Sequence, residues 1–268
     1  MGVYIRHTTV EMALPRGIDL FIFDVEGTLV DSIDTARPLP GARGLVGRIR
    51  RADRKVAFLS NIGRKPHREV LRRLRGAGFE ACPEELMTAG RAAALHLARR
   101  GARRVFLLSE GGAREDLRAA GLRTVRGPPA DVVVVAAHRG LAYRELNTAT
   151  RLVAGGVPLV CCGASLLFRG TYLGDSGLFL GEGAVARAIA AATGARMETV
   201  GKPDPRIFRE ALRQSGVPAK RAAMVGDSRS DMEGAARARL GLRVYLGSGR
   251  VEADLRFADI SRLARAWR

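Results

Sequence analysis

The chain has 268 residues, of which 47% are hydrophobic and 27% charged, a composition that excludes a disordered or fibrous protein and allows one large domain or two modest ones. No run approaches the roughly 18 uninterrupted apolar residues of a membrane span, and residues 1–16 lack a secretion-signal pattern, so we expect a soluble, cytoplasmic protein without a membrane partner. The formal net charge of +18 raises nucleic acid as a partner, but the arginines are scattered over most helical stretches and aromatic residues are only 5%, which predicts no specific nucleic-acid binding.

Short apolar runs that end in polar turns predict the strands of a parallel sheet. The first run, residues 20–25, ends in a carboxylate and a Glu-Gly-Thr turn, and the second, residues 55–59, ends in Ser60-Asn61. A helix expected at residues 41–51 separates them, which indicates a right-handed strand–helix–strand unit. Two more helices are expected at residues 66–75 and 90–100.

A second α/β layer follows. Apolar runs predict strands at residues 105–108, 132–136 and 159–162, with helices at 113–120 and 143–154 between them. The glycine-rich residues 170–183 favour a hairpin or a substrate-facing loop. The remaining elements are expected as helices at 184–192 and 206–214, strands at 222–225 and 242–246, and a basic amphipathic helix within 251–268.

Four polar clusters follow these strands or open a turn after one. They are Asp24-Val25-Glu26-Gly27-Thr28, Ser60-Asn61, Gly201-Lys202-Pro203, and Gly226-Asp227-Ser228 with Asp231. Because ligands of open parallel sheets bind at the carboxyl ends of the strands, we expect the clusters to converge on one crevice. Each has a plainer interpretation when taken alone: Asp24 as a turn residue or helix cap, and Asp227 and Asp231 as carboxylates of a helix first turn.

The order and spacing of these clusters resemble the four motifs of the haloacid dehalogenase superfamily. The long insertion between Ser60 and Lys202, with the runs LSNIGRKPHREVL and GKPDPRIF, is similar to the NagD-like, p-nitrophenylphosphatase-like branch. The resemblance implies an α/β fold with a Rossmann-like parallel-sheet core and an inserted α/β cap of the C2 type. The expected core is residues 1–102 and 199–268, with 1–16 a flexible extension, and the expected cap is residues 103–198.

The resemblance implies a phosphatase that uses Mg²⁺ and forms an aspartyl phosphate on Asp24. An Asp carboxylate is a competent nucleophile when a metal screens the phosphate, and Mg²⁺ prefers oxygen ligands. By resemblance, Asp24, the carbonyl of Glu26, and Asp227 would hold the metal, and Asp231 would steady its waters or Lys202. Ser60, Gly27 and Asn61 are expected to bind phosphoryl oxygens, and Lys202 to neutralise their charge.

The second acidic residue of the first cluster departs from the usual pattern of the superfamily, which has Asp there. Glu26 reaches up to ~1.5 Å further, one carbon–carbon bond. A glutamate can still act as a general acid and base, and the enolase-phosphatase branch carries a similar Asp-x-Glu-Gly-Thr turn. We therefore predict that Glu26 is the acid and base. The alternative is a catalytically weak protein that binds a phosphorylated ligand or a partner protein.

Substrate selection is expected between residues 162 and 183, in the cap. Relatives often carry an Asn-x-Asp segment after the corresponding strand, whereas this chain has Gly163-Ala164-Ser165 and lacks that carboxylate. Arg169 and Asp175 are the predicted contacts to the leaving group. The expected substrate is a small phosphorylated metabolite, such as a sugar, polyol or nucleoside monophosphate, and the resemblance implies a homodimer through the cap.

Overall fold

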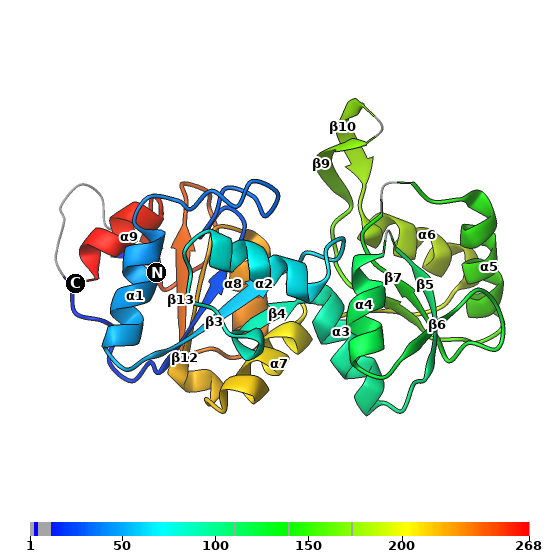
Figure 1. Cartoon of the computed structure of the whole chain (residues 1–268), viewed down its shortest axis with the longest axis horizontal. Coiled ribbons are helices and arrows are strands. Elements are labelled where there is room, and N and C mark those ends of the chain that lie inside the picture. The colour runs from blue at the N-terminus through cyan, green and yellow to red at the C-terminus, as the bar shows by residue number, and fades with distance from the viewer. Residues whose placement is uncertain (1–2, 5–11, 110, 139, 173, 268) are drawn as a thin grey trace. The chain divides into compact units, whose positions relative to one another are not determined.

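The computed structural model describes residues 3–4, 12–109, 111–138, 140–172 and 174–267 (Figure 1). The chain divides into two compact units. The first comprises Met1–Ser60, Arg68–Met87 and Pro203–Arg268, and the second Asn61–His67 and Thr88–Lys202. Both are built on parallel sheets, which confirms the predicted α/β class with an inserted α/β unit.

The first unit contains a seven-stranded sheet whose central strands carry the predicted clusters. Its order is β1 (Val3–Tyr4), β14 (Leu255–Phe257), β13 (Leu242–Leu246), β12 (Ala222–Gly226), β2 (Leu20–Asp24), β3 (Lys55–Ser60) and β4 (Leu86–Thr88). Strands β2 and β12 are buried along their whole length, as expected for parallel strands covered on both faces.

The helices of this unit pack in neighbouring pairs. Helix α1 (Ala42–Arg51) packs against α9 (Ile260–Ala266) and β3, and α7 (Pro205–Ser215) packs against α8 (Arg229–Arg237). Helix α2 (His67–Gly76) follows β3 in the chain. Predicted helices at 41–51, 66–75 and 206–214 therefore agree with the structure within one or two residues.

The second unit contains a five-stranded parallel sheet and a separate hairpin. The sheet order is β11 (Met197–Thr199), β8 (Leu159–Cys161), β7 (Val132–Val135), β5 (Arg104–Leu108) and β6 (Arg123–Val125). Its helices are α3 (Ala89–Arg99), α4 (Gly112–Ala119), α5 (Tyr143–Ala154) and α6 (Glu182–Thr193). A core that includes Phe106, Val133 and Ile189 fills the space between them.

The glycine-rich segment forms the predicted hairpin. Strands β9 (Leu167–Tyr172) and β10 (Asp175–Leu180) pair antiparallel, with Asp175 opposite Tyr172 and Leu178 opposite Arg169 (Figure 1). The predicted leaving-group contacts of Arg169 and Asp175 lie outside the described residues as far as their side chains are concerned, so both stay predictions.

The predicted helix over 251–268 is wrong in part. Leu255–Phe257 forms β14 and pairs in parallel with β13, and only Ile260–Ala266 is helical. The helix begins late because Asp259 caps it, with its side chain accepting a hydrogen bond from the Arg262 backbone N–H at 3.0 Å.

Two further predictions concern the N-terminal extension and the boundary between the two units. Of the predicted flexible extension, Val3–Tyr4 pairs with β14, whereas residues 1–2 and 5–11 lie outside the described residues. Helix α3 belongs to the second unit, where it packs against α4, and the predicted boundary at residues 102/103 stays a prediction.

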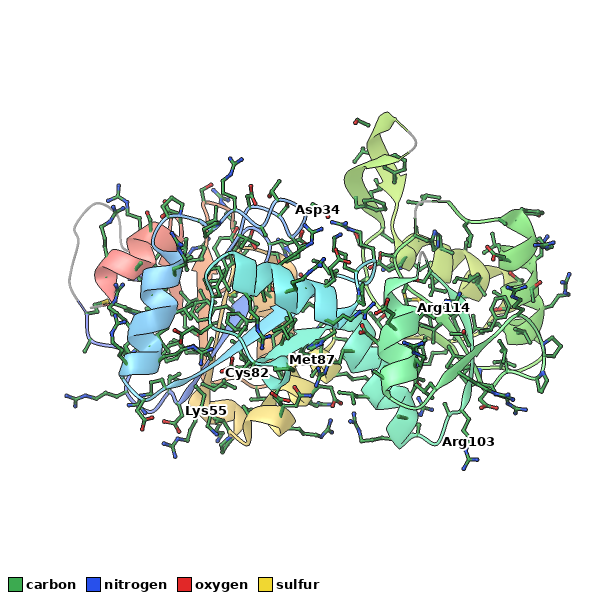
Figure 2. The ribbon with its side chains drawn as sticks, in the orientation of Figure 1. Asp34, Lys55, Cys82, Met87, Arg103 and Arg114 are labelled. Carbon is green, nitrogen blue, oxygen red and sulfur yellow. The ribbon has the colours of Figure 1, made fainter. Side chains whose placement is uncertain are left out.

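Charged side chains are spread over the outside of both units. Lys55 lies exposed on the first unit, and Arg103 and Arg114 lie exposed on the second (Figure 2). This distribution matches the scattered arginines of the sequence. Along the described ranges, no helix is both long and apolar enough to cross a membrane.

Candidate active site

The carboxyl ends of β2, β3 and β12 bring three of the predicted clusters to one edge of the first sheet. Phe23 lies opposite Val225 and Phe58, and Asp24 lies opposite Leu59. The next residues along the neighbouring strands are therefore Gly226 and Ser60. Asp24 and Ser60 are both buried, with 7% and 2% of their surface exposed, so the chemistry of this edge is shielded from bulk water.

Three carboxylates meet at this edge and form what we call the acidic cluster: Asp24, Asp227 and Asp231. One oxygen of each lies within 4.8 Å of one oxygen of both others. Asp231 is fully buried and Asp227 half-buried. Three like charges so close together and so shielded repel one another, and a bound cation relieves that repulsion. Since the donors are all carboxylate oxygens, the cluster fits a hard divalent cation such as Mg²⁺.

The start of α8 fixes the orientation of Asp231. Ser228 caps the helix by accepting a hydrogen bond from the Asp231 N–H at 3.2 Å, and its own N–H donates to Asp231 Oδ2 at 3.0 Å. The Ser228 hydroxyl donates to the same oxygen at 2.6 Å. This reciprocal capping box holds the carboxylate in place at the positive end of the helix dipole. The plainer interpretation of Asp231 as a first-turn carboxylate is therefore correct as well, and the same side chain belongs to the acidic cluster.

Glycines make room for the acidic cluster. Gly27 has φ +80°, and a Cβ at that position would overlap Asp227 Oδ2 and lie 2.9 Å from its Cγ. A Cβ on Gly226 would lie 2.6 Å from the Cγ of Asp231. The adjacent Thr28 is fully buried and its hydroxyl lies 3.4 Å from Asp227 Oδ1. Asp24 is a strand-end residue that caps no helix, because the chain after it forms a turn.

The carboxylate of Glu26 is held by the loop that follows it. Glu26 Oε1 accepts a hydrogen bond from the Ile33 N–H at 2.8 Å, and the side chain is half-buried. The turn itself is closed by bonds from the Gly27 N–H to the Val30 carbonyl at 2.8 Å and from the Leu29 N–H to the Val25 carbonyl at 2.9 Å. The longer side chain is thus anchored by one oxygen to a compact loop.

Asn61 and Lys202 lie in the second unit and contact each other. The Asn61 side chain accepts a hydrogen bond from the Lys202 N–H at 2.7 Å and donates one to the Lys202 carbonyl at 3.0 Å. Lys202 is 4% exposed. The Asn61 amide is thus engaged by the backbone of Lys202, which the prediction of a phosphate-binding Asn61 did not anticipate.

The sequence interpretation gave no role to three residues that orient the site: Thr28 and Ser228, which belong to the predicted clusters, and Ile33, which does not. Only Ser228 left a readable signal, because a serine three positions before an aspartate is the pattern of a capping box. A donor such as the Ile33 backbone N–H leaves no trace in residue type.

Comparison with known proteins gives the same assignment as the geometry. A family model for haloacid dehalogenase-like hydrolases matches residues 21–123, and a second model for similar hydrolases matches residues 199–255. The human haloacid dehalogenase-like hydrolase domain-containing protein 2 is 32% identical over 245 residues, which are 91% of this chain and 90% of that protein.

Two solved structures are also similar. A p-nitrophenyl phosphatase from Archaeoglobus fulgidus has a TM-score of 0.84 and 27% identity, and the match covers 93% of this chain and 99% of that one. A glycerol phosphate phosphatase from Mycobacterium tuberculosis, in complex with magnesium, has a TM-score of 0.78 and 25% identity over 92% of this chain and 77% of that one.

The chain belongs to the haloacid dehalogenase-like hydrolases. Within them it is a NagD-like, p-nitrophenylphosphatase-like member, a phosphoric monoester hydrolase, and both predictions made from the four clusters are confirmed.

Proposed function

We propose that this protein hydrolyses the phosphate monoester of a small metabolite, such as a sugar, polyol or nucleoside monophosphate, with Mg²⁺ as cofactor. The observation that carries the proposal is the acidic cluster at the carboxyl edge of the sheet, beside Ser60, in a chain of the phosphatase class. When bound there, Mg²⁺ would supply positive charge that screens the phosphoryl group from the carboxylates. Asp24, Asp227 and the backbone carbonyl of Glu26 would hold it, with Asp231 behind them.

The reaction has two steps on this chain's residues. In the first, Asp24 attacks phosphorus, the bond from phosphorus to the leaving oxygen breaks, and Glu26 gives its proton to that oxygen. In the second, the Glu26 carboxylate takes a proton from water, the water oxygen attacks phosphorus, and the bond to Asp24 breaks. Inorganic phosphate leaves, and both carboxyl groups return to their starting states.

The remaining predicted residues would stabilise charge on the phosphoryl oxygens. Ser60 and the turn N–H groups that directly follow Asp24 would donate hydrogen bonds, whereas the Gly27 N–H is used by the Val30 carbonyl, and the Lys202 ammonium would neutralise the charge. Arg169 and Asp175, on the two strands of the hairpin, would contact the leaving group. A cap over the site, and a homodimer made through it, remain part of this proposal, and a capped site favours small substrates over phosphoproteins.

The test is phosphate release from a panel of sugar, polyol, nucleotide and aryl phosphates. The wild-type chain is compared with Asp24→Asn and with EDTA-treated protein, and the mass of acid-quenched protein is measured for one added phosphoryl group. We expect turnover that both controls abolish, and a phosphoryl adduct in the wild-type chain alone. Equal turnover of Asp24→Asn would refute the nucleophile. Binding of a phosphorylated ligand without turnover of any ester would favour the catalytically weak alternative.

A further inference from the structure

The Asn61 side chain makes two hydrogen bonds to the backbone of Lys202. Its Oδ1 accepts from the Lys202 N–H at 2.7 Å, and its Nδ2 donates to the Lys202 carbonyl at 3.0 Å. Only a carboxamide offers an acceptor and a donor side by side, so neither Ser nor Asp can replace both bonds. The residue that follows Ser60 in the chain is therefore used to hold another residue of the proposed active site.

The bonds from Asn61 continue the ladder of backbone hydrogen bonds at the point where it ends. The Val200 N–H donates to the Cys161 carbonyl at 3.0 Å and the Gly201 N–H to the Cys162 carbonyl at 2.9 Å. The next backbone N–H is that of Lys202, which Asn61 takes. A Cβ on Gly201 would overlap the Cys162 carbonyl oxygen and lie 2.9 Å from Asn61 Oδ1, so the glycine leaves room for the amide.

The loop that follows Asn61 packs closely within the second unit. A Cβ on Gly63 would lie 3.3 Å from the Ala137 backbone N, and one on Gly112 would overlap the Arg64 carbonyl, so this loop packs directly on the residues that follow β7 and on the start of α4. The His67 N–H donates to Asp116 Oδ1 at 3.0 Å. The loop that carries Asn61 is thus fixed by packing and by the bond from His67 to Asp116.

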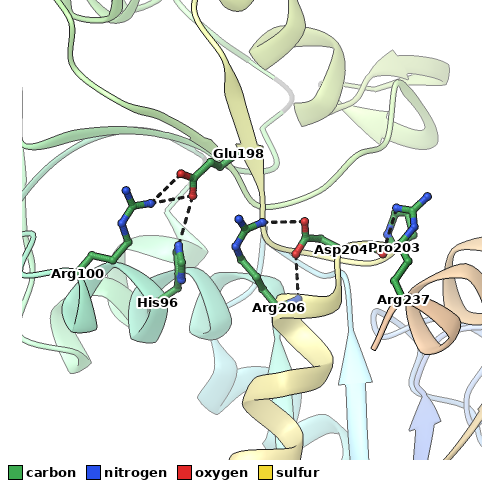
Figure 3. Close-up of polar contacts among 7 residues, drawn as sticks. All are labelled: His96, Arg100, Glu198, Pro203, Asp204, Arg206 and Arg237. Atoms are coloured by element: carbon green, nitrogen blue, oxygen red, sulfur yellow. Dashed lines mark hydrogen bonds and ion pairs between the residues drawn. The ribbon is translucent and has the colours of Figure 1, made fainter. Parts of the chain in front are cut away.

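The chain on both sides of Lys202 is also anchored (Figure 3). Before it, Glu198 of β11 pairs with Arg100 at 2.8 Å and with His96 at 3.5 Å. After it, Asp204 caps α7 by accepting from the Arg206 N–H at 2.9 Å. Between these anchored neighbours, Asn61 bonds both the N–H and the carbonyl of Lys202.

We propose that Asn61 is a positioning residue that sets the place of the Lys202 ammonium through the Lys202 backbone and does not bind phosphate. This role rests on the proposed function, in which Lys202 neutralises the phosphoryl oxygens. The lysine ammonium stands on a flexible four-carbon stem of fixed length. The position of the Lys202 Cα therefore limits the region that the ammonium can reach. A misplacement of about 1 Å at such a group costs on the order of 10²-fold in rate.

The first experiment tests the two hydrogen bonds from Asn61 to Lys202 without an activity assay. Amine-directed acylation followed by peptide mass analysis compares the four lysines of the chain, with exposed Lys55 and Lys220 as internal references. In Asn61→Ala, the acylation rate of buried Lys202 should rise on the order of 10-fold, which the loss of two hydrogen bonds allows. Asn147→Ala, the same change on α5, should leave it unchanged. An unaltered Lys202 rate in Asn61→Ala overturns the proposal.

The second experiment is a double-mutant cycle of Asn61→Ala with Lys202→Met. We expect kcat to fall on the order of 10²-fold in Asn61→Ala and not to fall further when Asn61 is removed from Lys202→Met, since both changes remove one function. Losses that multiply would mean that Asn61 contacts substrate directly, and an unchanged kcat in Asn61→Ala would also refute the role. If neither the wild-type chain nor Lys202→Met hydrolyses any ester, the proposed function fails. The acylation result alone then decides whether Asn61 positions Lys202.

Discussion

Replacing Glu26 separates its structural role from its proposed chemical one. Glu26 Oε1 accepts the Ile33 N–H at 2.8 Å, so the side chain both ties the loop and carries the proposed proton. Gln keeps an oxygen that can accept the same bond but has no proton to exchange. Asp moves the carboxyl back by ~1.5 Å and breaks the bond to Ile33. Ala removes both functions.

The two roles differ in size. A hydrogen bond to a charged group contributes about 1.5–3 kcal/mol, and Gln should keep most of it, so the free energy of unfolding of Glu26→Gln should fall by less than about 1 kcal/mol. General acid–base catalysis contributes about 10²–10⁴-fold, so kcat of Glu26→Gln should fall by that factor, or about 3–5 kcal/mol in the barrier. Glu26→Ala should lose both.

The assay combines urea unfolding with the pH profile of kcat/KM on the best ester of the panel. Because Gln carries no acid proton, kcat/KM of Glu26→Gln should lie below that of the wild-type chain at every pH. If Glu26→Gln keeps the wild-type kcat and profile while Glu26→Ala is less stable, Glu26 is only a loop tie and the assignment of the acid is wrong.

Three further predictions concern the surroundings of the site. Gly27→Ala should abolish activity and lower the melting temperature more than Gly121→Ala, which has the same φ near +80° but nothing within 4 Å of its Cβ position. Ser228→Ala should cost about 1 kcal/mol in urea unfolding and raise the Mg²⁺ concentration for half-maximal activity, because it removes the helix cap and frees a carboxylate of the acidic cluster. Burial raises the pKa of Asp116 to about 6, against the lowering effect of its bond to the loop and of Arg91. Between pH 4 and 6 the Asp116 carboxyl therefore holds more of its proton in the folded chain than in the unfolded one, so its own contribution to the free energy of unfolding should fall by about 3 kcal/mol as pH rises through that window. The difference in unfolding free energy between the wild-type chain and Asp116→Asn should show this slope.

Each of these has a result that contradicts it. Equal melting temperatures and activities of the two alanine variants would show that the space beside Gly27 is not needed. A Ser228→Ala protein with unchanged Mg²⁺ dependence would separate the helix cap from the cation site. If the stability of the wild-type chain relative to Asp116→Asn rises between pH 4 and 6, the Asp116 carboxylate gains more from Arg91 and the His67 N–H than it loses by burial.

The strands that carry the site were predictable because their side chains repeat a simple pattern. Residues 20–24 are buried on both faces and end in a carboxylate, so an apolar run followed by a polar turn gave both the strand and the edge where Asp24 lies. The shortest strands were not predictable, since three-residue elements such as Leu86–Thr88 and Leu255–Phe257 carry too little periodicity, and pairing with a distant strand decides their conformation.

The sequence predicted which residues form the site, but it did not predict all of their hydrogen-bond partners. Asp227 and Asp231 were expected near Asp24 from the four clusters. The engagement of Asn61 with Lys202 joins residues 141 positions apart, and no spacing in the sequence shows which polar atom an amide will bind. Glu26 was recognised as a departure from the usual aspartate, whereas its bond to Ile33 depends on the path of a loop.

The glycines of the clusters explain why the clusters depend on one another. A Cβ on Gly27 would overlap a carboxylate oxygen of Asp227, one on Gly226 would overlap a carboxylate oxygen of Asp231, and one on Gly201 would press on the amide oxygen of Asn61. Gly27 and Gly201 each provide space for a polar atom of another cluster, and Gly226 provides it for Asp231 of its own cluster. At Gly27 and Gly226 the atoms in the way are those of the carboxylates themselves, so a single methyl group would displace a carboxylate of the site by a large part of an ångström, the scale at which rates fall on the order of 10²-fold. The glycine positions should therefore be as sensitive to substitution as the charged residues beside them.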